Sequence, residues 1–228
     1  MVDATNGQCQ FCAIAEGRGT NGVDEILQES ENFVAVASVG SLTPGWMLIV
    51  PKSHQLSLAG SPAMEEFEAF SSDVAERISA LFAGAPVRAF EHGANRDGSP
   101  VGCGVNHAHL HLLPSTQSLI PFFPNASMSL RWETSRFSDV AGRACGREYL
   151  YYCENALDPV ALGQIAVVQA PMSQFFRRAV ASSIGQDAQF DYHAYPCLSN
   201  VERTIKLYGC DTNVEWSFAD RHSRRAAA

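Results

Sequence analysis

Lysine is scarce in this chain, and long apolar runs are missing. Only Lys52 and Lys206 are lysines among 228 residues, and the formal net charge is −8. Proteins that bind nucleic acid or coat anionic membranes gather Lys and Arg against phosphates, so this charge balance argues against both functions. No apolar run approaches the roughly 20 residues of a membrane-spanning helix. The polar first ten residues also lack the features of a signal peptide, so we expect a cytoplasmic protein.

Cysteine is present in an odd number, which does not suit a framework of disulfides. The chain has seven cysteines, and Cys9 and Cys12 form the one closely spaced pair. Reduced thiols are typical of a reducing compartment, and a CxxC pair in such a protein suggests a zinc site.

Histidine is concentrated at one place. Three of the seven histidines, His107, His109 and His111, alternate with Ala108 and Leu110. Spacing of two is typical of a strand, here with imidazoles on one face and core residues on the other. Imidazole packs no better than leucine, so the pattern indicates metal ligation, proton transfer or a nitrogen nucleophile.

The segment from residue 24 to residue 113 contains most of the recognisable elements. Strands are predicted at residues 33–37 and 46–50, separated by a Pro-Gly turn. A helix is predicted from residue 61 to residue 81, where apolar residues recur at helical spacing. A strand at 87–91, a loop at 93–104 and the histidine strand from residue 105 follow. The order predicts an α+β fold, an antiparallel sheet covered by a helix.

The second half of the chain gives weaker signals. Strands are expected near residues 148–152 and 164–169, and a helix near 171–184. We therefore expect a catalytic domain at residues 1–115 and a smaller C-terminal α/β extension or subdomain at 116–220. The last residues, 221–228, are expected to be a disordered tail.

Three segments together resemble the histidine triad (HIT) superfamily. They are the CxxC segment at residues 9–12, the stretch Thr43-Pro44-Gly45 to His54, and the His-Ala-His-Leu-His-Leu-Leu run at residues 107–113. The last of these matches the family's defining signature, and the resemblance covers about the first half of the chain. It implies a HIT-like antiparallel sheet.

The resemblance implies chemistry on a nucleotide-containing small molecule. Members of the superfamily release or transfer nucleoside monophosphates through a nucleotidyl-histidine. His109 would be the nucleophile, and His111 would steady the charge or orientation of the site. Water as the acceptor gives a hydrolase, which we favour slightly, and another acceptor gives a nucleotidylyltransferase. A non-catalytic nucleotide-binding module is the alternative from another class.

Some triad proteins hold a zinc ion at positions that are matched here by Cys9, Cys12, His54 and His107. Two thiolates and two imidazoles form a closed tetrahedral set, which favours structural zinc over catalytic zinc. A catalytic zinc held by the three histidines stays as an alternative. The resemblance also implies a homodimer, although the C-terminal segment could cover the interface.

The candidate substrate-binding residues are Ser38 and residues of two further regions. The stretch from Phe90-Glu91 to Gly102-Cys103-Gly104 resembles the region before the catalytic histidine of galactose-1-phosphate uridylyltransferases, so we expect it beside the phosphate. Arg177 and Arg178 could grip an anionic part of the substrate, although a solvated helix face is the simpler explanation.

The chain also departs from the family pattern. Ser38 stands where an Asp or Asn commonly holds the ribose, and Trp46 replaces a frequent histidine. Cys103-Gly104 replaces a glutamine followed by Ser or Thr, so base, sugar and leaving group are not implied by the resemblance. We expect Trp46 to fill the core rather than stack on a ligand.

Overall fold

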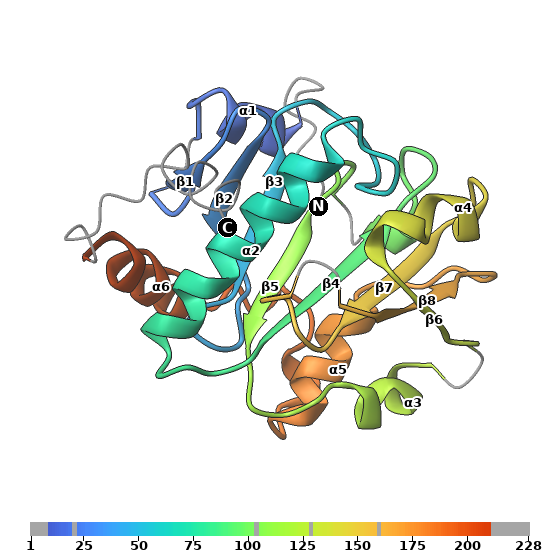
Figure 1. Ribbon diagram of the computed structural model, residues 1–228. Helices are drawn as coiled ribbons and strands as arrows, with labels where there is room; N and C mark the ends of the chain where they lie inside the picture. Colours follow the sequence, from blue (N-terminus) through green and yellow to red (C-terminus); the bar gives the residue numbers. More distant parts are fainter. Residues whose placement is uncertain (1–8, 20–21, 103–104, 128–129, 159–160, 211–228) are drawn as a thin grey trace, which may run out of the picture.

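The protein is built on one continuous antiparallel sheet (Figure 1). The computed structural model describes residues 9–19, 22–102, 105–127, 130–158 and 161–210. The sheet has eight strands in the order β1-β2-β3-β5-β4-β7-β8-β6, and neighbouring strands are antiparallel. The strands are β1 Ile26–Glu29, β2 Phe33–Ala37, β3 Met47–Pro51, β4 Val87–Gly93, β5 Leu110–Pro114, β6 Glu133–Ser135, β7 Tyr149–Cys153 and β8 Gly163–Val167.

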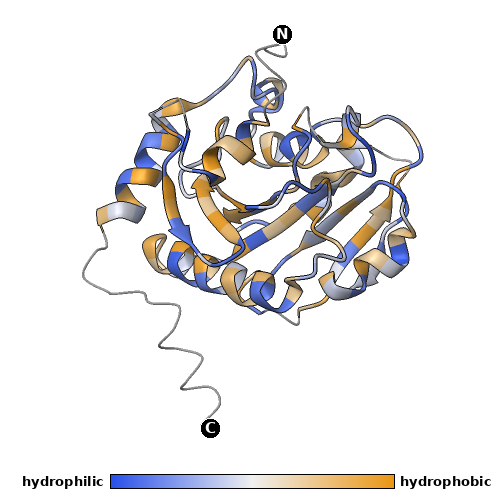
Figure 2. Cartoon of the chain, turned by 90° about the horizontal axis from the view of Figure 1, so that it is seen from above, coloured by the Kyte–Doolittle hydropathy of each residue, from blue (hydrophilic) through white to orange (hydrophobic). Residues whose placement is uncertain are grey.

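Helices cover both faces of the sheet (Figures 1 and 2). They are α1 Gln10–Ala15, α2 Met64–Leu81, α3 Phe123–Ala126, α4 Val140–Ala144, α5 Phe175–Ser183 and α6 Leu198–Cys210, with short 3-10 turns at Pro100–Gly102, Ile120–Phe122, Phe137–Asp139 and Asp187–Gln189. No helix within these described ranges combines the length and apolar character needed to span a membrane.

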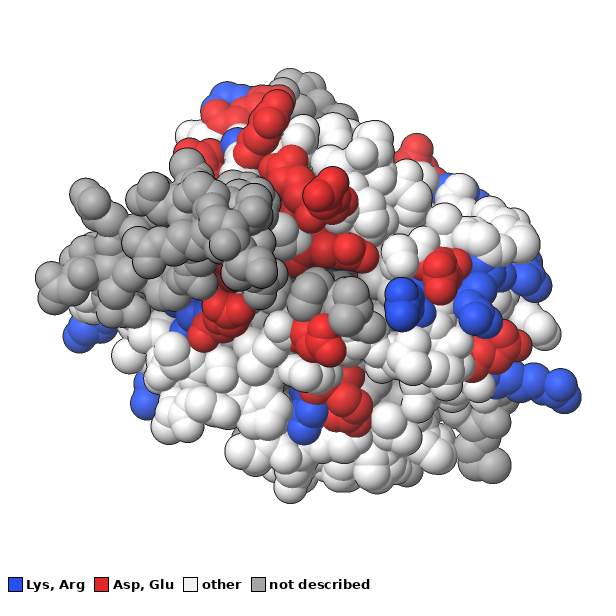
Figure 3. Space-filling view, in the orientation of Figure 1, with Lys and Arg blue, Asp and Glu red and all other residues white. Residues whose placement is uncertain are grey.

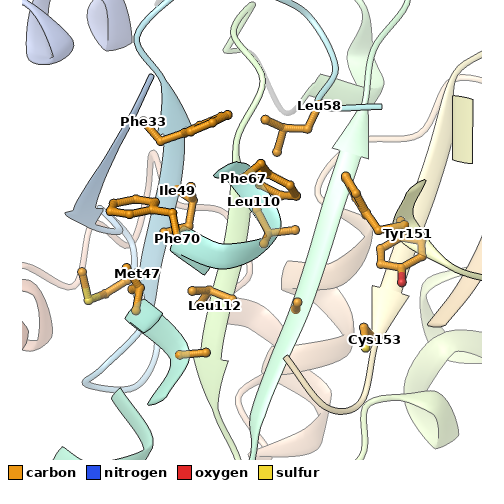
Figure 4. Close-up of a cluster of buried hydrophobic side chains, with 14 of the residues drawn as sticks. Phe33, Met47, Ile49, Leu58, Phe67, Phe70, Leu110, Leu112, Tyr151 and Cys153 are labelled. Carbon is orange, nitrogen blue, oxygen red and sulfur yellow. The ribbon is translucent and has the colours of Figure 1, made fainter. Parts of the chain in front are cut away.

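The core between α2 and the sheet follows from the periodicity of both elements. Phe67, Phe70, Val74 and Ile78 recur at helical spacing on α2 and are buried. They pack against strand residues that alternate along the chain, so every second strand residue points toward α2 (Figure 4). The opposite side of α2 carries acidic residues, and acidic side chains occupy the middle of the face in Figure 3.

The other face of the sheet is covered in two places. An aromatic-rich cluster joins α3 and α5 to β4, β5 and β7, and includes Trp46, Phe90 and Phe176. A smaller cluster places Phe11 and Ile14 of α1 over β2 and β3. The chemistry-bearing residues described below lie between these two clusters.

The expected α+β fold with an antiparallel sheet and a covering helix is confirmed. Strands from the C-terminal half, β6, β7 and β8, continue the same sheet across residue 115. Helix α6, for which we had no prediction, packs back on the first half, where Tyr208 bonds Gln28 and Thr204 bonds the Gly45 N–H. The domain boundaries stay a prediction, and the expected tail at 221–228 lies outside the described residues.

Three predicted boundaries need correction. Helix α2 begins at Met64 rather than at residue 61. The histidine strand was expected from residue 105, but the β5 ladder begins at Leu110. The cause is that Ala108 donates its backbone N–H to Gln55 O (2.6 Å), so this part of the chain bonds the segment after β3. Helix α5 begins at Phe175 rather than residue 171, because Gln174 has a positive φ of 56°.

Candidate functional site

The three histidines share one face of an extended segment, as their spacing predicts. Ala108, Leu110 and Leu112, the residues between and after them, are buried in the core beneath α2. His109 and His111 point to the opposite face and line a cavity of about 700 Å³, which is within the range of small-molecule sites. His107 is directed instead toward the CxxC segment.

The cavity walls come from distant parts of the chain. Helix α1 supplies Phe11 and Ile14, strand β2 and the turn after it supply Val36 and Ser38, and α5 supplies Arg177. Further lining residues come from the connections around α5 and α6 and include Tyr192, His193 and Leu198. One side of the cavity is therefore apolar, and the histidines with Arg177 lie together at a polar part.

The hydrogen bonds of His109 leave one ring nitrogen for chemistry. Its Nδ1 lies 2.9 Å from His107 O, and a carbonyl can only accept, so Nδ1–H is the donor. Burial lowers the pKa of His109 below its ordinary value, which favours the neutral ring. Nε2 then carries the free lone pair. The ring of Phe11 lies edge-on at 5.2 Å between centroids and limits the positions the imidazole can take.

His111 has the opposite tautomer. The indole Nε1–H of Trp46 donates to His111 Nδ1 at 3.0 Å. Trp has no acceptor, so the His111 proton must be on Nε2. Burial, followed by the neighbouring His109, lowers the pKa of His111 well below its ordinary value. The imidazole rings of His109 and His111 lie 4.8 Å apart between centroids, so a ring with an acceptor nitrogen and a ring with a donor N–H are neighbours.

Four residues form a cluster suited to a metal ion. The Sγ atoms of Cys9 and Cys12 and the ligand nitrogens of His54 and His107 all lie within 4.8 Å of one another. His107 Nε2–H donates to Pro51 O at 2.8 Å, which leaves Nδ1 facing Cys9 Sγ at 3.3 Å. Thiolate and imidazole ligands with the outer ring nitrogen held by a carbonyl fit tetrahedral zinc. The four residues would close the coordination sphere.

The cluster is joined to the cavity by α1. Cys9 precedes the first residue of this short helix and Cys12 lies within it. Its Phe11 contacts both the metal-facing His107 and the cavity-facing His109. A metal bound by Cys9 and Cys12 would therefore hold one wall of the cavity in place.

The structure brings some expected substrate-binding residues to the cavity and not others. Ser38 and Arg177 line it. Arg178 is exposed on the other side of α5, where its guanidinium lies over Phe190. Gly102 ends a 3-10 turn before the segment that carries the histidines, and Cys103 and Gly104 lie outside the described residues.

Glu91 lies on the opposite face of the sheet from the cavity. Its carboxylate accepts hydrogen bonds from the Leu58 backbone N–H (2.7 Å) and from the Tyr149 hydroxyl. Complete burial raises the pKa of Glu91 to about 7, although both hydrogen bonds act in the other direction. The structure gives this residue a place in the core between β4, β7 and the segment after β3.

Arg177 is almost fully buried, and hydrogen bonds hold its guanidinium in place. Its Nη2 donates to Gly40 O and its Nε to Phe190 O, both at 2.7 Å. Gly40 has a φ of +81°, and a Cβ there would lie 2.4 Å from Tyr192 Cβ, so the turn requires glycine. The guanidinium is therefore a fixed positive charge at the cavity.

Several residues that line the cavity had no role predicted from the sequence. Phe11 was treated only as part of the CxxC segment, and exposed His193 was given no role, yet both line the cavity. His92 also lines it, two residues beyond Phe90 on β4. The alternation of β4 could have placed His92 on the face of His111, since Phe90 pairs with His111.

Comparisons with known proteins agree on one family. A model described as "HIT domain" matches residues 20–118. Uncharacterized HIT-like proteins of two Mycobacterium tuberculosis strains are 31% identical over 108 residues, which cover 46% of this chain and 70% of each relative.

Solved structures of HIT proteins are also similar to part of the chain. A zinc-bound histidine triad family protein from Mycobacterium smegmatis is 29% identical, with 47% of this chain and 74% of that chain covered and a TM-score of 0.35. A HIT family protein from Bacillus anthracis is 23% identical, with coverages of 50% and 77% and a TM-score of 0.41.

Proposed function

The chain belongs to the histidine triad (HIT) family, and we propose that it hydrolyses a nucleotide-containing phosphate ester, anhydride or phosphoramidate through a nucleotidyl-His109 intermediate. The observation that carries this proposal is the pairing of tautomers at the cavity. His109 offers a free Nε2 lone pair, and His111, 4.8 Å away between ring centroids, offers an Nε2–H.

In the first half of the reaction, His109 Nε2 attacks the phosphorus. The Nε2–P bond forms, the bond from phosphorus to the leaving group breaks, and the leaving group departs with the electron pair and takes up a proton. The His109 ring gains positive charge as it attacks. Its Nδ1–H stays bonded to His107 O, which stabilises that charge and fixes the direction of Nε2.

In the second half, water attacks the phosphorus and the Nε2–P bond breaks. The electron pair returns to Nε2, a proton from the water is lost to solvent, and a nucleoside monophosphate is released. His111 Nε2–H is suited to donate a hydrogen bond to an oxygen on the phosphorus or on the leaving group, where negative charge develops. Arg177 adds a fixed positive charge near the same place.

Zinc has a structural place in this proposal. The ion would be held by Cys9, Cys12, His54 and His107. It would cross-link α1 to the histidine segment and would take no part in the reaction itself. The apolar wall from Phe11, Ile14 and Val36 is suited to the base or the sugar of the nucleotide.

A test uses a panel of p-nitrophenyl esters of nucleoside 5′-monophosphates in water enriched in ¹⁸O, with His109→Ala as the control. The proposal expects release of a nucleoside monophosphate that carries one ¹⁸O atom, and no release by His109→Ala. A wild-type protein that forms the His109 adduct but releases nucleotide only when an alcohol or phosphate acceptor is added would be a transferase. A wild-type protein that binds the nucleotide without any turnover would be a binding module.

A further inference from the structure

His92 is a fourth histidine at the cavity. It lies on β4, where Glu91 pairs with Leu110 of β5. His92 and His109 are the next residues along these two antiparallel chains, so they lie on the face opposite Glu91 and Leu110. His92 is only 5% exposed and lines the same cavity as His109 and His111.

The hydrogen bonds of His92 leave a donor without a partner. Its Nε2 lies 3.4 Å from the backbone nitrogen of Phe176 and accepts that N–H. Burial lowers the pKa of His92 to about 3, so the ring is neutral and its proton is on Nδ1. This buried Nδ1 has no hydrogen-bond partner among the residues that the structure describes. A buried N–H is rarely left unpaired, and at a cavity the missing partner is suited to be a ligand.

The surroundings of His92 fix the position of the ring. It packs at right angles to Phe90, at 6.3 Å between centroids, and against Phe176 at 5.0 Å. The ring of His111 lies 6.0 Å away at an interplanar angle of 83°. Two neutral imidazoles, each with one N–H not bound to the protein backbone, therefore stand beside the nucleophile.

We propose that His92 is a further substrate-binding residue, whose Nδ1–H donates a hydrogen bond to a nonbridging oxygen of the phosphoryl group that His109 attacks. The inference rests on the proposed function, since it needs a phosphoryl group at His109 Nε2. His111 and His92 would then contact oxygens on the same phosphorus, with Arg177 nearby. Donors held in place before the reaction stabilise the charge of the transition state without reorganising.

The test compares two substitutions of similar size. His92→Asn keeps an N–H close to the position of Nδ1, whereas His92→Leu fills the space without a donor. With the p-nitrophenyl ester that the wild type hydrolyses best, we expect His92→Leu to lower kcat/KM by about 10- to 100-fold and His92→Asn by less than about 5-fold. Both variants within twofold of the wild type would overturn the inference while leaving the proposed function standing. No turnover by the wild type would overturn both.

A second measurement separates a contact to the phosphoryl oxygen from a structural role. Replacing one nonbridging oxygen by sulfur gives two diastereomers of the substrate. We expect the loss caused by His92→Leu to shrink for one diastereomer and to persist for the other, because only one oxygen accepts from His92. An equal loss for both diastereomers and for the oxygen substrate would assign His92 a packing role and overturn the inference.

A measurement on the wild type covers the case in which His92→Leu does not fold. In ¹⁵N-labelled protein, the released nucleoside monophosphate is added and the side-chain ¹⁵N signals of His92 are followed. A shifted and slowly exchanging Nδ1–H signal supports the contact. A His92 Nδ1–H signal that stays unchanged at saturating nucleotide contradicts it.

Discussion

Trp46 donates its indole N–H to Nδ1 of His111 at 3.0 Å. Because Nδ1 accepts this bond, the neutral ring of His111 carries its proton on Nε2. Both residues are buried, so water does not compete for the bond. Trp46 fills the core, as expected from the sequence, within the cluster of Phe90 and Phe176. It also orients a histidine of the site, a role that a hydrophobic residue without a donor could not have.

The first prediction concerns this bond. Trp46→Phe keeps a ring in the core but leaves the buried Nδ1 of His111 unpaired, which we expect to cost about 1–3 kcal/mol of stability. The His111 proton is then free to move to Nδ1, so the rate of nucleotide release should fall by about 10-fold or more. The measurement pairs steady-state kinetics with ¹⁵N NMR of His111. An unchanged Nε2–H tautomer with an unchanged rate would contradict the role given to Trp46.

The second prediction concerns the metal cluster. We expect elemental analysis of the wild type to find about one zinc ion per chain. Cys12→Ser should contain much less zinc and should unfold at a clearly lower temperature. Cys145→Ser is the matched control, since Cys145 is exposed and outside the cluster, and it should keep both. If chelation stopped turnover while the melting temperature stayed the same, zinc would be catalytic and the structural assignment would be wrong.

The third prediction separates the two adjacent arginines of α5. Arg177→Gln removes a buried guanidinium that bonds Gly40 O and Phe190 O, so we expect lower stability and a KM raised by about 10-fold or more. Arg178→Gln removes the same charge from the same helix on the exposed side and should change KM by less than about twofold. Equal effects of the two variants would mean that Arg177 has no special part in substrate binding.

The fourth prediction concerns Glu91. Its pKa is raised from 4.5 to about 7 in the folded protein, so the folded state binds the proton more tightly than the unfolded state. The contribution of Glu91 to stability is then fully present below about pH 4.5 and is lost as the pH rises to about 7. Between these pH values we expect the wild type to lose about 1–3 kcal/mol of its free energy of unfolding that Glu91→Gln does not lose.

Denaturant unfolding of the wild type and of Glu91→Gln at several pH values between 4.5 and 8 gives the comparison. Other groups titrate in both proteins, so the difference between the two curves isolates Glu91. Parallel curves would show that the carboxylate keeps an ordinary pKa.

The sequence contained enough information for the central strands and for the face of the sheet on which His109 and His111 lie. Alternation at residues 107–112 predicts which side chains meet the core, and the resemblance to the HIT superfamily implies the ligand set Cys9, Cys12, His54 and His107, which the structure brings together. The position of His107 and His109 outside the regular ladder was not predictable, because it depends on Ala108 bonding a distant segment, at Gln55.

Residues of the second half were harder to place. Arg177 and Arg178 are adjacent in the sequence, and only the packing of α5 decides that the first is buried at the cavity and the second exposed. Glu91 and His92 show the same limit, since one step along β4 moves a side chain from one face of the sheet to the other. Helix α6 has apolar residues at helical spacing but joins the fold through contacts such as Tyr208 with Gln28, more than 150 residues away.

The central claim is that His109 Nε2 forms a bond to phosphorus. The most direct measurement is rapid quenching of the wild type with the hydrolysed nucleotide ester, followed by intact-mass spectrometry and peptide mapping, beside His109→Ala. We expect the wild type to gain the mass of one nucleoside monophosphate less water, located at His109, and the variant to gain nothing. Turnover by the wild type without this adduct, or the same adduct on His109→Ala, would contradict the account.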